Sequence, residues 1–116
     1  MKKSALSLLL LALAAPALAD PPVIEAAQMR GGQIHVTVSH PDSGWDHYAD
    51  IWRVYGPDGA ELAERVLLHP HETEQPFTRS TALDPVEGTG AVTVVAGCTD
   101  GDLSEPFELV LGDGDS

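Results

Sequence analysis

The chain has 116 residues and a formal net charge of −12, because 18 acidic residues outnumber six lysines and arginines. This length is enough for one domain with a modest core. Such an excess of negative charge argues against nucleic acid and anionic lipid as partners, and it would attract a cationic ligand.

The first residues have the composition of a secretory signal peptide. Lys2 and Lys3 form a basic start, an apolar run covers residues 5–15, and residues 17–19 (Ala-Leu-Ala) form a small-x-small cleavage site. The apolar run is short for a membrane span, which disfavours the alternative of a retained anchor. The residue after the cleavage site is Asp20 and not cysteine, which argues against a lipid anchor at this point.

This pattern divides the chain into three predicted segments. We expect residues 1–19 to be a removed signal peptide, residues 20–111 to fold as one β-sandwich domain, and residues 112–116 to be a flexible acidic tail. After removal of the signal, no later segment is long and apolar enough to cross a membrane. The predicted location is therefore the periplasm or the outside of the cell, without membrane contact.

Alternation of apolar and polar residues predicts β-strands in the rest of the chain. Ile34, Val36 and Val38 alternate with polar residues, as in a strand with one buried face. Residues 61–68 have a composition that a short helix would also tolerate. The Pro-Asp-Gly turn within residues 56–59 favours a strand there instead, because turns of this kind join hairpins.

The predicted elements follow one another at short intervals. Strands are expected near 23–24, 34–39, 51–55, 61–68, 91–98 and 107–111, with turns at 30–33 and 56–59 and a loop-rich stretch at 70–90. About seven short strands separated by frequent turns are typical of an antiparallel β-sandwich. The predicted fold class is therefore all-β.

Four of the five histidines fall in two short polar segments, His40 with His47 and His69 with His71. Neutral imidazole is the commonest metal ligand, and carboxylates join it at hard or borderline sites. Residues two apart on an extended chain point to one side, so His69 and His71 are placed to bind together. The pattern predicts a metal ion, either copper, iron or zinc. The alternative for His40 and His47 is that they order their loop through hydrogen bonds to neighbouring aspartates. The alternative for His69 and His71 is that Pro70 makes this segment a rigid surface turn.

Cys98 is the only cysteine, so it cannot form a disulfide within the chain. It follows the apolar alternation of Val92, Val94 and Ala96, which predicts a buried thiol. A role as metal ligand is the other interpretation, and the residues leave both open.

The order of several motifs resembles the superoxide reductase family, which includes desulfoferrodoxin and neelaredoxin. The likeness covers most of the chain after residue 19. It rests on residues 22–26 (Pro-Val-Ile-Glu-Ala), His40-Pro41, His47-Tyr48 with the following strand at 51–55, and Cys98. The resemblance implies an immunoglobulin-like antiparallel β-sandwich that holds iron.

Members of that family hold a ferrous iron with four histidines and one cysteine. By this resemblance His40, His47 and Cys98 stand at ligand positions, whereas Asp20 and Asp100 stand where the family has histidines. The spacing from His40 to His47 is one residue longer than in the family motif. The resemblance therefore implies three shared ligands and two replaced ones.

These observations predict an exported metal-binding β-sandwich protein with a carrier or redox role. The candidate metal ligands are His40, His47, His69, His71 and Cys98. Two alternatives stay open, namely superoxide reductase activity on a modified iron site and a non-enzymatic module that binds a periplasmic protein partner. The chain has no phosphate-binding loop, dinucleotide fingerprint or Gly-x-Ser-x-Gly motif, so no other reaction is indicated.

Removal of the signal peptide is directly testable. We expect intact-mass measurement of the exported protein to give a chain that begins at Asp20, because Ala17 and Ala19 supply the small residues of a cleavage site. A retained Met1, or a start far from Asp20, would contradict this prediction.

Overall fold

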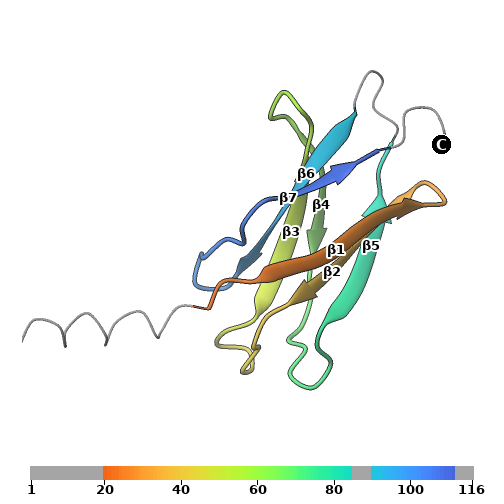
Figure 1. Cartoon of the computed structure of the whole chain (residues 1–116). Coiled ribbons are helices and arrows are strands. Elements are labelled where there is room, and N and C mark those ends of the chain that lie inside the picture. The colour runs from red at the N-terminus through yellow and green to blue at the C-terminus, as the bar shows by residue number, and fades with distance from the viewer. Residues whose placement is uncertain (1–19, 85–89, 112–116) are drawn as a thin grey trace, which may run out of the picture.

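The computed structural model describes residues 20–84 and 90–111, which form seven β-strands in two sheets (Figure 1). The strands are β1 (Val23–Arg30), β2 (Gln33–Ser39), β3 (Ala49–Tyr55), β4 (Glu61–Val66), β5 (Phe77–Ala82), β6 (Ala91–Cys98) and β7 (Phe107–Val110). Within the described residues there is no helix. The predicted all-β class with about seven strands is confirmed.

Both sheets are antiparallel and lie face to face as a sandwich. The smaller sheet has the order β1-β2-β5, and the larger has the order β4-β3-β6-β7. β5 returns to pair with β2, and β6 crosses to pair with β3, so the chain passes repeatedly between the sheets. Figure 1 shows the two layers and the loops gathered at their two ends.

The core lies between the facing surfaces of the sheets. Ile34, Val36 and Val38 of β2 are fully buried, as is Trp52 of β3. Side chains of a strand alternate between its two faces, so burial of every second residue leaves His35 on the outer face of β2. The alternation predicted for this strand is confirmed.

The turn between β1 and β2 depends on two residues with left-handed backbone. Arg30 pairs with Gln33, so only Gly31 and Gly32 connect the strands. Their φ angles are 62° and 79°. Glycine adopts positive φ without steric strain, and two such residues give a hairpin turn whose twist matches that of the strands.

The prediction of a loop-rich stretch at 70–90 is wrong for β5. This strand lies inside the stretch and pairs with β2 through all its residues. Only Phe77 in it is buried, so no apolar alternation marks the strand in the sequence. Pairing with β2 decides its conformation, supported by a 2.7 Å hydrogen bond between the hydroxyls of Thr37 and Thr78.

The strand predicted at 61–68 is confirmed by β4, which pairs with β3. The predicted signal peptide (1–19) and tail (112–116) lie outside the described residues. In the part of the chain that the structure describes, no helix has the length and apolar character needed to span a membrane.

The two tryptophans provide a matched test of the core. Trp52 is fully buried, so Trp52→Ala should lower the free energy of unfolding by about 3–5 kcal/mol, because the cavity cannot close completely. Trp45 is 68% exposed, and Trp45→Ala should change the same quantity by no more than about 0.5 kcal/mol. Urea unfolding of residues 20–116, followed by circular dichroism, measures both. Equal losses would contradict the assigned core.

Candidate metal site

Three of the predicted ligands meet at one end of the sandwich although they lie far apart in the sequence. His40 directly follows β2, His47 lies just before β3, and Cys98 ends β6. β3 and β6 are antiparallel neighbours, with Ala49 opposite Cys98. This register places the loop 40–48 against Cys98, at the lower end of the sandwich in Figure 1.

The candidate ligand atoms lie close enough to share one ion. The ring centroids of His40 and His47 are 4.7 Å apart, and the ring planes are nearly perpendicular. Nε2 of His47 lies 3.7 Å from Sγ of Cys98. One ring nitrogen of each histidine and the Cys98 sulfur all lie within 4.8 Å of one another. The three side chains form a compact group of two nitrogens and one sulfur.

A buried carboxylate fixes the orientation of the His40 ring. Nδ1 of His40 lies 2.6 Å from Oδ1 of Asp42, and both side chains are fully buried. A carboxylate oxygen only accepts hydrogen bonds, so Nδ1 carries the proton and Nε2 keeps its lone pair. This Nε2 is buried and finds no hydrogen-bond partner among the described residues. A metal ion would satisfy it, because metal-bound histidines usually place their other nitrogen on a carboxylate or carbonyl.

Asp42 also accepts hydrogen bonds from two backbone groups. Its Oδ1 receives the N–H of Ala49 at 3.0 Å, and its Oδ2 receives the N–H of His71 at 2.7 Å. One carboxylate thus joins the loop after β2 to the start of β3 and to the β4–β5 connection. In the sequence, Asp42 could be anticipated only as one of several aspartates near His40.

A second carboxylate, that of Asp100, lies beside the other two candidate ligands. Sγ of Cys98 donates to Oδ1 of Asp100 at 2.8 Å, and Oδ2 of Asp100 lies 3.2 Å from Nε2 of His47. Burial raises the pKa of the Cys98 thiol to about 11, and the hydrogen bond to Asp100 adds to the rise. The same hydrogen bond, together with one from the Asp102 backbone, lowers the pKa of the Asp100 carboxyl. At neutral pH the pair is therefore a neutral thiol beside a carboxylate.

His69 and His71 are not part of this group of ligand atoms in the described chain. His71 is buried and stacks on Phe77, with ring centroids 3.9 Å apart, and its Nε2 accepts a 2.9 Å hydrogen bond from Arg79. Burial, and then the Arg79 charge, lower the pKa of His71. His69 is exposed, with its ring 4.7 Å from that of His71. His71 reaches the site only through Asp42, to which its backbone N–H donates.

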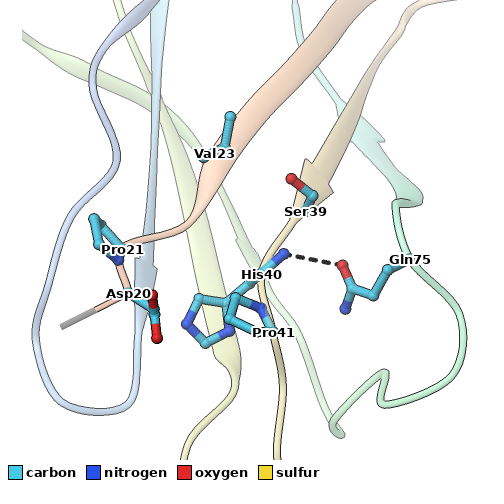
Figure 2. A pocket seen from close by; sticks show the side chains of 7 residues that line it. All are labelled: Asp20, Pro21, Val23, Ser39, His40, Pro41 and Gln75. Atoms are coloured by element: carbon cyan, nitrogen blue, oxygen red, sulfur yellow. Dashed lines mark hydrogen bonds between the residues drawn. The ribbon is translucent and has the colours of Figure 1, made fainter. Parts of the chain in front are cut away.

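Asp20 lies at a surface pocket that borders the site. This pocket is lined by Asp20, Pro21, Val23, Ser39, His40, Pro41 and Gln75. Figure 2 shows the Asp20 side chain beside the His40 ring, and the 2.9 Å hydrogen bond from the His40 backbone N–H to the Gln75 side-chain oxygen. Asp20 and Asp100 therefore both lie near the candidate ligands.

Comparison with known proteins supports the fold. A superoxide reductase (1Fe-SOR) from Giardia intestinalis superposes with a TM-score of 0.56 and 16% sequence identity, over 77% of this chain and 96% of that one. At this identity the likeness shows the fold alone. The superoxide reductase-like fold implied by the motifs is therefore confirmed. No protein-family model matches the chain.

One sequence relative is a protein from Halomicrobium mukohataei named "Putative lipoprotein". It is 44% identical over 71 residues, which is 61% of this chain. The match covers 35% of that protein, so this chain spans about a third of its length. The relative's name assigns no chemistry to the shared segment.

The raised pKa of Cys98 predicts how the metal-free thiol reacts. Alkylation needs the thiolate, so in the folded protein its rate should stay low at neutral pH and rise with pH toward about 11. In denaturant the midpoint should fall back toward the ordinary value of 9.0. Because the folded pKa is the higher, this group's contribution to stability is present below pH 9 and is lost as pH rises through 11. Identical midpoints in folded and unfolded protein would contradict the assigned environment.

Proposed function

We propose that this chain is an exported metal-binding protein, a carrier or redox protein for copper, iron or zinc, built on a superoxide reductase-like β-sandwich. The observation that carries the proposal concerns His40, whose buried Nε2 lacks a hydrogen-bond partner among the described residues and which forms a group with His47 and Cys98.

The donor set suits a borderline metal ion. Two imidazoles and one thiolate are ligands that zinc, copper and iron all accept in proteins. Cys98 binds as the thiolate, so metal binding displaces the thiol proton into solvent. Asp42 holds the His40 ring in the tautomer that leaves Nε2 free for the ion. His69 and His71 remain weaker candidates, because His71 is engaged by Arg79.

Export is supported by two observations. The first residues have the pattern of a signal peptide, and a relative that shares part of the chain is named as a lipoprotein. We therefore propose a periplasmic or secreted location for the domain formed by residues 20–111.

Superoxide reduction is the second candidate function, and the observation that favours it is the fold shared with the Giardia enzyme. The charge of the chain opposes it, because superoxide is an anion and the chain has a formal net charge of −12. Superoxide consumption by the iron-loaded protein, compared with that of His47→Ala, separates this activity from simple metal binding.

Calorimetry of metal-free residues 20–116 tests the proposed function. We expect about one copper, zinc or ferrous ion per chain, and His47→Ala should weaken binding at least roughly tenfold, since it removes one donor. His35→Ala is the matched control and should leave affinity unchanged, because His35 lies on the outer face of β2.

If calorimetry detects no site tighter than the millimolar range for copper, zinc or ferrous iron, the proposed metal binding is refuted. The alternative of a module that binds a periplasmic protein partner then takes its place.

A further inference from the structure

A tight turn at the end of β6 holds the Asp100 carboxylate over the Cys98 sulfur. The N–H of Gly101 donates to the carbonyl of Cys98 at 2.8 Å, and Gly101 has a φ of 94°, so the chain reverses directly after the cysteine. The N–H of Asp102 donates to Oδ1 of Asp100 at 3.1 Å. The backbone, rather than free rotation of the side chain, therefore sets the position of this carboxylate.

The distances from Nε2 of His47 to Asp100 and to Cys98 match the edges of a coordination tetrahedron. With zinc bond lengths of about 2.3 Å to sulfur and about 2.0–2.2 Å to nitrogen or oxygen, the nitrogen–oxygen edge is about 3.4 Å and the sulfur–nitrogen edge about 3.6 Å. Oδ2 of Asp100 lies 3.2 Å from Nε2 of His47, and Sγ of Cys98 lies 3.7 Å from the same nitrogen. The two distances that start at Nε2 of His47 are therefore those expected between ligands of one ion. The 2.8 Å from Sγ of Cys98 to Oδ1 of Asp100 is that of a hydrogen bond, which is lost when the thiol proton leaves on metal binding.

An independent observation indicates that an ion belongs at this point. His40 is 3% exposed, and its Nε2 is one of three buried side-chain nitrogens without a partner among the described residues, the others being Nε1 of Trp52 and Nδ1 of His71. Of the residues with such a nitrogen, only His40 has a ring nitrogen within 4.8 Å of the ligand atoms of His47 and Cys98 in the described chain. The hydrogen bonds within the Asp100 turn do not account for an unpartnered imidazole in this group.

We propose that Asp100 is the fourth ligand of the site, and that the set His40, His47, Cys98 and Asp100 selects zinc. This inference rests on the proposed metal-binding function and adds a ligand and a metal to it. Zinc favours four tetrahedral ligands of mixed nitrogen, sulfur and oxygen type. The thiolate and the carboxylate together neutralise a divalent ion, so no net charge is left in a partly buried site.

The carboxylate is what distinguishes zinc from copper here. Two histidines and one cysteine alone would suit a copper site with a weak axial ligand, and the soft thiolate favours Cu(I). A carboxylate oxygen is a hard donor that suits a divalent ion and not Cu(I). The fourth ligand therefore disfavours Cu(I), the oxidation state of copper that the thiolate would otherwise favour.

Cobalt substitution tests the ligand set without any assay of activity. Residues 20–116 loaded with Co²⁺ should show the intense visible bands of a four-coordinate ion and a near-ultraviolet thiolate charge-transfer band. In Asp100→Asn we expect the visible bands to change while the thiolate band remains, and zinc affinity to fall at least roughly tenfold. In Asp100→His, which supplies a nitrogen donor, four-coordinate bands should return.

Asp46→Asn is the matched control. It removes one negative charge next to His47 in the sequence, but its side chain is exposed and is not among the grouped ligand atoms. Its zinc affinity and cobalt spectrum should equal those of the wild type. Circular dichroism and urea unfolding of the metal-free variants show whether each one is folded.

The outcomes separate this inference from the function on which it rests. If wild type binds metal and Asp100→Asn binds zinc equally well with an unchanged cobalt spectrum, Asp100 is not a ligand and only this inference fails. If Asp102→Asn and not Asp100→Asn weakens binding, the fourth ligand is misassigned and the inference is also overturned. If wild type binds Cu⁺ more tightly than Zn²⁺ in direct competition, the metal is misassigned. If wild type binds no metal at all, the proposed function itself fails.

Discussion

The arrangement of the site depends on the buried carboxylate of Asp42. This group accepts hydrogen bonds from the His40 ring and from the backbone of Ala49 and His71, and so joins three segments that meet only in the folded chain. Hydrogen bonds to a charged group contribute about 1.5–3 kcal/mol each, and loss of the acceptor would leave buried donors without partners. A carboxylate removed from water is stable only when its oxygens are satisfied in this way. The loop 40–48 therefore has a defined conformation even though it forms no regular strand.

The same interaction prepares His40 for a ligand. Once Nδ1 is committed to Asp42, the ring can offer only Nε2 to the interior of the site, and its plane cannot rotate freely. His71 stabilises this arrangement, because its backbone N–H donates to Asp42. Its own ring is held by stacking on Phe77 and by the hydrogen bond from Arg79. The segment that contains His69 and His71 thus contributes to the candidate metal site through Asp42 and not through its own imidazoles.

The fold and the donor set carry different information about function. The sandwich is shared with a superoxide reductase, but a fold supports many activities and chemistry is decided by the side chains placed on it. Asp20 and Asp100 place two carboxylates near the candidate ligands, in a chain that is already strongly acidic. These carboxylates lower the net charge of the site. The local potential then favours a cation and repels an anionic substrate.

The sequence by itself determined the all-β class, the alternation of buried residues in β2 and the hairpin turns, because each is marked by local pattern or by residue type. It also supplied the candidate ligands His40, His47, His69, His71 and Cys98. It did not reveal β5, whose polar residues become a strand only by pairing with β2. Only the tertiary structure decided which donors meet. Pairing of β3 with β6 brings Cys98 to His47, the turn at Gly101 returns Asp100 to both, and Arg79 engages His71 instead. These contacts join residues up to about fifty positions apart, and no local pattern records distances of that kind.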